Sequence, residues 1–268
     1  MKKLLDKLKS LKTFQDNFSE KINEDNKNKT TSFEKNKQEN NSNLLSQKNA
    51  ILLLKEYNIN FPDIFIVDNK KDLEHIKIDF PVVLKVDSPE IIHKTDFGLV
   101  YTNINNFLEL YKKIDLIETI LKNKKIEHYN LVIQKMIFGK ELILGMKTDP
   151  IFGKSILLGL GGIYTEILKD FSVRVLPITK EDCHEMISEL KSKKFLENYR
   201  NTKSINFESL INLMLNFSNL AEKENFFEID FNPVIANEND CYVVDARFIN
   251  KPKEHIKIQQ KLDKFDIQ

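Results

Sequence analysis

The sequence predicts an α+β protein built from two lobes. Short apolar runs that suit strands alternate with segments of helical periodicity over residues 44–251. Of the 268 residues, 41% are hydrophobic, which is enough for a substantial core in one large domain or in two lobes. Glycine is rare, with seven in the chain, and three of them fall within residues 159–162. Three glycines so close together indicate a turn in which the backbone adopts a conformation, or makes a close contact, that a side chain would prevent.

The chain divides by composition into three parts. Residues 1–43 are rich in Lys and Asn, lack Gly and Pro, and contain few apolar residues in their second half. Such a segment cannot offset its ordering entropy by burial, so we expect a disordered low-complexity extension. The folded part is expected over residues 44–251, with one lobe over 44–130 and the other over 131–251. Residues 252–268 are expected to form a C-terminal tail.

The first lobe is expected to open with a helix. Apolar residues within 44–57 suggest helical spacing, and the run Ile-Phe-Ile-Val at 64–67 predicts a short strand after it. Two further strands and a second helix complete this lobe, at 80–86, 99–102 and 105–122.

The second lobe reads as a larger sheet with two helices. A hairpin is expected around Asp149-Pro150 and Gly153, because these residues favour turns. The predicted strands cover residues 131–136, 141–146, 155–158, 226–232 and 241–247, and the predicted helices cover residues 180–190 and 207–224.

Charge and cysteine content exclude several classes of protein. The formal net charge is +1, so no global field would recruit nucleic acid or an anionic membrane. Two cysteines, Cys183 and Cys241, are too few for a disulfide framework and lack metal-ligand spacing, which fits a reducing compartment. No apolar run reaches the length of a membrane span, and the N-terminus lacks the apolar segment of a signal peptide. We therefore expect a cytoplasmic protein.

The glycine cluster at residues 159–162 points to phosphate chemistry. Residues without a Cβ let backbone N–H groups approach an anion closely, as in loops that cradle phosphates. The sequence contains neither a Walker-type Gly-x-x-x-x-Gly-Lys-Ser/Thr motif nor Gly-x-Gly-x-x-Gly. A nucleotide site would therefore need a different fold.

An acid-bearing strand near the C-terminus is the candidate metal site. Strand alternation within 226–233 puts Glu228, Asp230 and Asn232 on one face. Asp245 follows thirteen positions after Asn232, a spacing that suits a neighbouring antiparallel strand. Oxygen donors on adjacent strands suit Mg²⁺, which takes a few protein ligands together with phosphate oxygens and water. The alternative is an ordinary solvated sheet face, on which such alternation is common.

Three basic side chains are candidates for phosphate chemistry. Lys85 interrupts an apolar strand, so it either snorkels from a sheet face or directs its ammonium at a phosphate. His93 lies in the polar loop 92–96 and is either a surface imidazole or an acceptor of a phosphoryl group. Arg174 is one of three arginines among 41 basic residues, and it either binds phosphate bidentately or makes a structural ion pair.

Five ordered segments of the chain resemble one protein family. They are residues 80–98, 159–162, 171–177, 228–233 and 244–247. Over residues 44–251 the chain resembles the ATP-grasp β subunit or domain of ADP-forming acetyl-CoA (acyl-CoA) synthetases, which is related to the β subunit of succinyl-CoA synthetase. The resemblance implies an ATP-grasp fold with the nucleotide held between two lobes. It also implies the reaction acyl-CoA + ADP + phosphate ⇌ carboxylic acid + CoA + ATP.

The resemblance further implies a set of site residues, with ATP or ADP and Mg²⁺ as the bound groups. The implied set consists of Lys85, Glu141, Gly161 and Gly162 for the nucleotide, Asp230, Asn232 and Asp245 for Mg²⁺, Arg174 for phosphate, and His93 as the relay of the phosphoryl group. Lysine, arginine, metal and backbone amides are the groups that phosphoryl transfer requires, because that reaction depends mainly on positioning and charge neutralisation.

A partner is also implied by the resemblance. The family's other subunit or domain binds CoA and forms the phosphohistidine, and we expect this chain to work in a hetero-oligomer with a separate CoA-binding α subunit. Two alternatives stay open. One is a nucleotide-binding regulatory or scaffold subunit without transfer activity, favoured by Leu99, where the family usually has a second glycine. The other is a stand-alone ATP-grasp carboxylate ligase, which would not need His93 as a relay.

Overall fold

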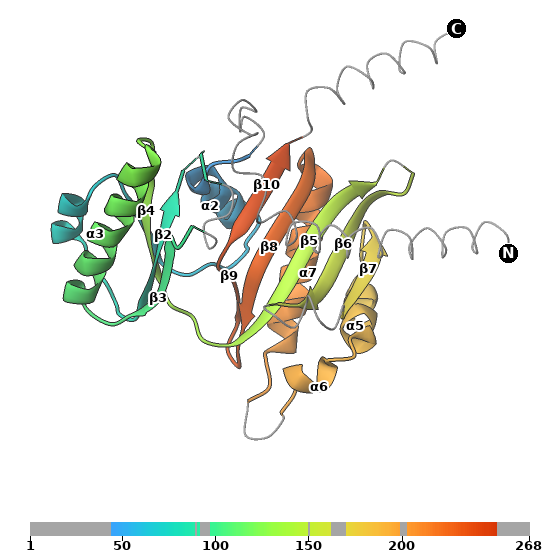
Figure 1. The fold of residues 1–268 in the computed structure, drawn as a ribbon. Coiled ribbons are helices and arrows are strands. Elements are labelled where there is room, and N and C mark those ends of the chain that lie inside the picture. Colours follow the sequence, from blue (N-terminus) through green and yellow to red (C-terminus); the bar gives the residue numbers. More distant parts are fainter. Residues whose placement is uncertain are drawn as a thin grey trace, which may run out of the picture.

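The computed structural model describes residues 44–88, 90–91, 97–149, 151–161, 170–198 and 203–250. The extension predicted over 1–43 and the tail predicted over 252–268 lie outside these ranges. The described residues form two α+β lobes, each with its own antiparallel sheet and hydrophobic core (Figure 1). None of the helices in these ranges has the length and apolar character needed to cross a membrane.

The first lobe has a four-stranded sheet in the order β1-β4-β2-β3. Its strands are β1 (Ile64–Val67), β2 (Val82–Asp87), β3 (Val100–Ile104) and β4 (Asn130–Lys135), and its helices are the 3₁₀ helix η2 (Lys70–His75) and α3 (Phe107–Lys124). Helix α3 begins after Asn106, whose side chain accepts a hydrogen bond from the Glu109 amide, and ends at Lys125 in the left-handed conformation. Its buried residues pack with those of the sheet in one cluster.

The second lobe has a larger sheet in the order β10-β8-β5-β6-β7, with β9 paired to β8. Its strands are β5 (Lys140–Asp149), β6 (Gly153–Leu160), β7 (Phe171–Val175), β8 (Phe226–Ala236), β9 (Cys241–Val243) and β10 (Ala246–Asn250). Its helices are α5 (Lys180–Glu189), α6 (Lys193–Leu196) and α7 (Phe207–Lys223). Figure 1 shows α5 and α7 on one face of this sheet.

The predicted boundary between the lobes at residue 130 is wrong. Strand β4 pairs with β1 and β2, so it belongs to the first lobe. Helix α2 (Gln47–Glu56) was expected in the first lobe, but its apolar residues Ala50 and Leu54 are buried in the core of the second. The described chain therefore contributes α2 to the second lobe, then forms the first lobe, and afterwards forms the rest of the second lobe. The local sequence could not predict this order, because α2 packs against β10, which lies more than 150 residues later in the chain.

The predicted strand over 241–247 is interrupted in the structure. Strand β9 pairs with residues 234–236 of β8, while β10 pairs with residues from 226 to 231. Between them, Val244 and Asp245 lie outside both strands, opposite Pro233. Proline has no N–H to donate to a ladder, which is consistent with a break in pairing at this point.

The two faces of the larger sheet have different surroundings. In antiparallel pairs, residues directly opposite each other point to the same face. One row across the sheet runs from Arg247 through Asp230, Gly145 and Leu157 to Val173. Leu157 and Val173 belong to a small apolar cluster distinct from the helix-packed core. Asp230 and Arg247 therefore lie on the face opposite α5 and α7.

Candidate functional site

Lys85 connects the two lobes at the candidate site. It lies in β2 opposite Val132, and only 7% of its surface is exposed. Its Nζ donates a hydrogen bond of 2.6 Å to the backbone oxygen of Val244, in the break between β9 and β10. A lysine from one lobe thus ends beside Asp245 of the other, so the predicted phosphate-binding cation and a predicted metal ligand are brought together.

The three predicted metal ligands also lie together. The backbone N–H of Asn232 donates to the backbone carbonyl oxygen of Asp245 at 3.2 Å, which fixes the two backbones side by side. Asp230 precedes Asn232 by two positions in β8, and its electrostatic environment includes Asp245.

The electrostatics of Asp230 suit a cation-binding carboxylate. Burial raises the pKa of Asp230 from 3.8 to about 6; Arg247 opposes this increase, whereas Glu228 and Asp245 add to it. A carboxylate whose proton affinity is raised by neighbouring carboxylates also gains from a nearby positive ion. The environment therefore favours a cation over an empty, fully ionised site.

The chemistry of the donor set fits Mg²⁺. Two carboxylates and one amide supply hard oxygen atoms, and Mg²⁺ usually completes its octahedron with phosphate oxygens and water. Within the described ranges, no group of three or more His, Cys, Asp or Glu side chains is arranged so that it could hold a metal ion by itself. A set that needs further ligands from a substrate is consistent with that finding.

Glu141 and Gly161 lie against each other at the start of β5. The Gly161 amide donates to the Glu141 oxygen at 2.8 Å. A Cβ on Gly161 would come within 2.8 Å of the Glu141 Cβ and 2.9 Å of its carbonyl carbon. Glycine at this position therefore serves the close approach of β6 to β5. Because its N–H is already bonded, Gly161 shows no amide directed at a phosphate, and its predicted role there stays a prediction.

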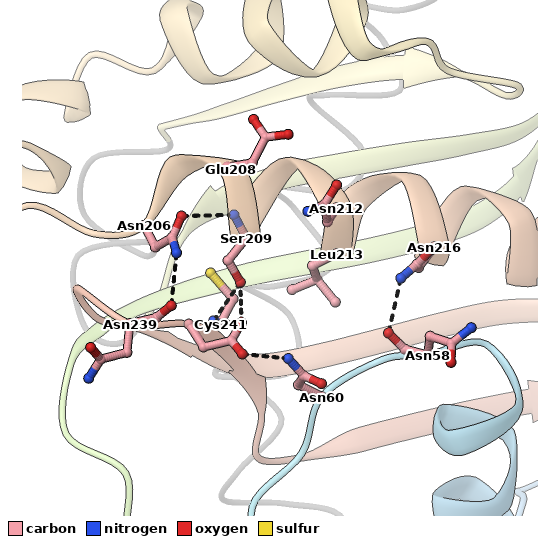
Figure 2. A pocket seen from close by; sticks show the side chains of 11 residues that line it. Asn58, Asn60, Asn206, Glu208, Ser209, Asn212, Leu213, Asn216, Asn239 and Cys241 are labelled. Atoms are coloured by element: carbon pink, nitrogen blue, oxygen red, sulfur yellow. Dashed lines mark hydrogen bonds between the residues drawn. The ribbon is translucent and has the colours of Figure 1, made fainter.

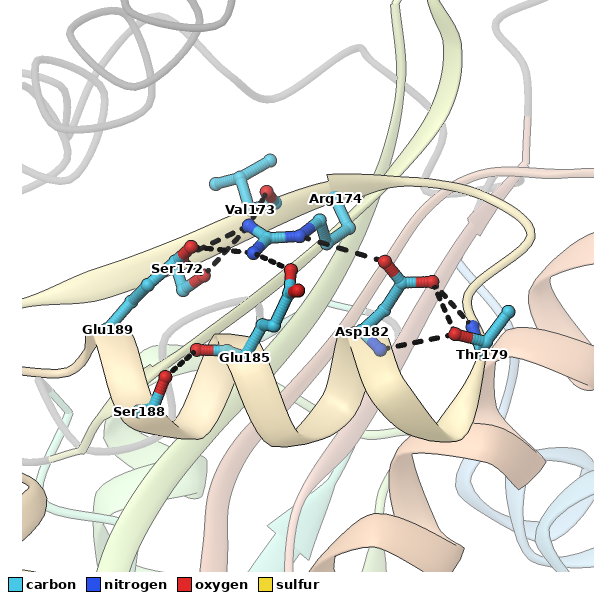
Figure 3. A network of polar contacts seen from close by, with 8 residues as sticks. All are labelled: Ser172, Val173, Arg174, Thr179, Asp182, Glu185, Ser188 and Glu189. Carbon is cyan, nitrogen blue, oxygen red and sulfur yellow. Dashed lines mark hydrogen bonds and ion pairs between the residues drawn. The ribbon is translucent and has the colours of Figure 1, made fainter.

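Arg174 lies away from the other predicted site residues. In β7 it is opposite Ile156, a member of the helix-packed core, so its side chain is on the face of the sheet covered by α5. Figure 3 shows its guanidinium bonded to the carboxylates of that helix, with 2.6 Å to Glu189 and 3.2 Å to Glu185. Its hydrogen bonds lower the pKa of Glu189. The ion-pair interpretation describes this arrangement, and the structure does not bring Arg174 together with Asp230.

Two predicted residues, His93 and Gly162, lie outside the described residues, as does the rest of the polar loop 92–96. Leu99, the departure from the family pattern, is fully buried in the core of the first lobe. Its side chain therefore has a packing function of its own.

Arg247 is a site residue that the sequence analysis did not select. It lies opposite Asp230 in β10, on the same face. Its Nε is buried and has no hydrogen-bond partner among the described residues. The sequence signals were the scarcity of arginine among the 41 basic residues and the place of Arg247 in the segment 244–247. Neither signal gives the face on which its side chain lies, because that depends on the register of β10 on β8.

A polar cavity of about 310 Å³ lies at the start of α7, on the far side of the β8–β9 turn (Figure 2). Its polar groups largely bond to one another. Ser209 donates to Asp240, Asn60 Nδ2 donates to Asp240 Oδ2 at 2.7 Å, and Asn206 Nδ2 donates to the Asn239 oxygen at 2.8 Å. These bonds hold the turn that leads back toward Asp245, so the cavity has a structural explanation.

Comparison with known proteins gives a consistent set of relatives. The model of a family described as ATP-grasp domain matches residues 36–249. The chain is 40% identical over 211 residues to the acetate–CoA ligase (ADP-forming) I subunit beta of Pyrococcus furiosus, covering 76% of this chain and 91% of the relative. It is 40% identical over 188 residues to the acetate–CoA ligase (ADP-forming) I of Archaeoglobus fulgidus, covering 68% of this chain and 27% of that longer protein.

A solved structure is similar over most of the chain. The dinucleotide-forming acetyl-coenzyme A synthetase 1 of Ca. Korarchaeum cryptofilum, in complex with coenzyme A and Ca-AMPCP, aligns with a TM-score of 0.73 and 31% identity, covering 78% of this chain and 94% of that one. The same protein has also been solved with Mg-AMPPCP and a phosphohistidine segment that points towards the nucleotide binding site.

Proposed function

Because the chain belongs to the ATP-grasp family of ADP-forming acetate–CoA ligase β subunits, we propose that it transfers a phosphoryl group reversibly between a phosphohistidine and ADP. In the direction of ATP formation, the N–P bond of the phosphohistidine breaks and a P–O bond to the terminal phosphate of ADP forms. This step couples the cleavage of an acyl-CoA thioester to ATP formation.

One observation carries the proposal. The ammonium of Lys85 comes from the first lobe and ends at Val244 of the second, adjacent to Asp245 and near Asp230 and Asn232. Positive charge and hard oxygen ligands from two lobes converge at one place. Such convergence provides the positioning and charge neutralisation on which phosphoryl transfer depends.

Each residue has a proposed task in this step. Asp230, Asn232 and Asp245 would hold Mg²⁺, which when bound supplies positive charge to the phosphate oxygens. Lys85 binds a phosphate and neutralises part of its charge. Glu141 faces the nucleotide at the start of the second lobe, and we assign the relay of the phosphoryl group to His93 as a proposal from the sequence motif.

We place CoA binding on a separate α subunit. The Pyrococcus furiosus relative is named a β subunit, and this chain covers 91% of it. In the Archaeoglobus fulgidus relative the matching part is 27% of a single chain, which leaves room there for other functions. A cytoplasmic location is proposed as well, because ATP and ADP are available there and both described cysteines are free thiols.

The test is to co-purify the chain with its candidate α subunit and to measure acyl-CoA-dependent ATP formation. We expect activity from the complex, none from either chain alone, and a loss of at least about 100-fold in His93→Ala, because general acid–base and nucleophilic steps contribute factors of this size. Activity of the chain alone with a free carboxylate would instead support a stand-alone ligase. Nucleotide binding without transfer in any combination would support a regulatory subunit.

A further inference from the structure

Arg247 carries a buried donor that has no partner within the part of the chain that the structure describes. Its Nε–H is shielded from solvent and donates to no oxygen of the described residues. An unsatisfied buried donor is uncommon in folded proteins and calls for an explanation, of which a ligand is one. A guanidinium also has five N–H donors arranged as a planar fork, the geometry that matches the oxygens of a phosphate.

The position of Arg247 indicates that a phosphate ligand could supply the oxygen atoms that its guanidinium needs. It stands opposite Asp230 on the face of the sheet away from the helices, and two residues beyond Asp245. The guanidinium is close enough to oppose the effect of burial on Asp230. A cation on Asp230 and Asp245 would draw phosphate oxygens to this place, within reach of the neighbouring arginine.

The other described arginine differs from Arg247 in each respect. Arg174 donates to carboxylates of α5 and to the Val173 oxygen, and it lies on the helix-covered face. The guanidinium of Arg174 would have to give up its hydrogen bonds to these carboxylates before it could bind a phosphate. The Nε–H of Arg247, in contrast, has no carboxylate partner to give up among the described residues.

Resting on the function proposed above, we propose that Arg247 is the arginine that binds the phosphoryl oxygens of the nucleotide beyond its α-phosphate. Its fork contacts the terminal phosphate from the β10 side, while Lys85 contacts it from the first lobe. Arg174 instead fastens α5 to the sheet. This assignment gives to Arg247 the phosphate-binding role that the family resemblance implied for Arg174.

Calorimetric titration of the full chain with ADP and with AMP, each with Mg²⁺, tests the assignment. The informative quantity is the ratio of the two affinities, because a structural defect would weaken both nucleotides alike. In Arg247→Gln we expect the preference for ADP over AMP to fall by roughly 10- to 100-fold, the value of a charge-assisted contact. In Arg174→Gln we expect this preference to stay within about 3-fold of wild type while the midpoint of thermal unfolding falls.

Arg247→Lys keeps the positive charge but removes the planar guanidinium. This variant tests whether Arg247 binds the phosphate if Arg247→Gln does not fold. We expect it to lose a smaller but measurable part of the preference. An unchanged preference in both Arg247 variants overturns the assignment while leaving the nucleotide site intact, as does a loss confined to Arg174→Gln. If the wild-type chain binds neither nucleotide, the proposed function fails together with the inference.

Discussion

At the scale of single residues, the site contains charged and polar groups whose buried positions are energetically unfavourable when no ligand is bound. Asp230 has a raised pKa, and the Nε–H of Arg247 is a buried donor without a partner among the described residues. Each of these features is unfavourable for folding alone, and binding sites commonly retain such groups.

Replacing Asp230 by Asn should stabilise the ligand-free protein at pH 7. The folded state binds the proton of Asp230 more tightly than the unfolded chain, since the pKa rises from 3.8 to about 6. The wild type therefore loses stability as the pH increases through that window, by up to about 3 kcal/mol before solvent screening is allowed for. Thermal unfolding of both proteins should show a gain for the variant at pH 7 that shrinks towards about pH 4.

Glu238 provides the control for that measurement. Its hydrogen bond with Lys203 lowers its pKa, so Glu238→Gln should show no gain at neutral pH. If the unfolding midpoint of Asp230→Asn matched that of the wild type throughout the pH range, burial of this carboxylate would be unimportant for stability.

Gly161→Ala should destabilise the protein by about 1–3 kcal/mol, the usual cost of overpacking. The added Cβ meets the backbone of Glu141 at 2.9 Å, and backbone cannot rotate out of the way. Chemical denaturation compares this variant with Gly153→Ala, where the Cβ has open space but the backbone has φ +78°. The smaller effect is expected at Gly153, about 1 kcal/mol, and the reverse order would contradict the close approach of β6 to β5.

At the scale of elements, side-chain caps decide where the helices of the second lobe begin. Thr179 forms a capping box with Asp182, in which the Thr179 hydroxyl accepts from the Asp182 amide and the Asp182 carboxylate accepts from the Thr179 amide at 2.7 Å. Ser192 precedes α6 but makes no capping bond, and its buried hydroxyl has no hydrogen-bond partner among the residues that the structure describes. A hydroxyl residue at the start of a helix is therefore stabilising at position 179, where it caps the helix, but is unfavourable at position 192, where its hydroxyl is left unsatisfied by the described residues.

These two caps give a matched prediction. Thr179→Ala should cost about 1 kcal/mol of unfolding free energy, the typical value of a lost N-cap. Ser192→Ala should be neutral or slightly stabilising, because it removes an unsatisfied buried hydroxyl. Urea denaturation measures both, and equal losses in the two variants would show that the assigned caps do not determine these helix starts.

Elements were more predictable from the sequence than their arrangement. Hydrophobic periodicity placed α3, α7 and β2 within a few residues, because local pattern is all that these assignments need. It missed β7 as a strand and joined β9 to β10, since neither the pairing of β7 with β6 nor the interruption opposite Pro233 is a local property. Local pattern also could not assign α2 to the second lobe.

The same distinction holds within the site. Lys85, Asp230, Asn232 and Asp245 were predicted from residue types and spacing, and the structure brings them together. The faces of the two arginines depend on strand register instead. A shift of one residue in either strand would exchange their sides, and only the observed pairing separates them.

At the scale of the whole molecule, the two lobes meet through a contact that belongs to the site. The hydrogen bond from Lys85 to Val244 joins the sheets of both lobes beside the proposed metal ligands. A nucleotide bound there would contact both lobes at once, so binding should stabilise the whole folded part.

Mg²⁺ with ADP should therefore raise the stability of the full chain by about 2.7 kcal/mol at a ligand concentration 100 times the dissociation constant. Lys85→Met and Asp245→Asn each remove a contact from a different lobe, and both should abolish most of the shift in thermal unfolding at the same ligand concentration. Lys203→Met, an exposed lysine paired with Glu238, should retain it. A full shift in Lys85→Met would exclude a site shared by the lobes.

The contact of Leu44 and Leu45 with β10 protects the edge strand of the larger sheet. Leu44 bridges to Ile249 and the Leu45 amide donates to the Phe248 oxygen at 3.0 Å. This short segment occupies hydrogen-bonding groups that a lateral strand would otherwise offer to another chain. Shortening the protein past Leu45 would uncover a template for intermolecular strand addition, so self-association should follow even though the catalytic groups are untouched.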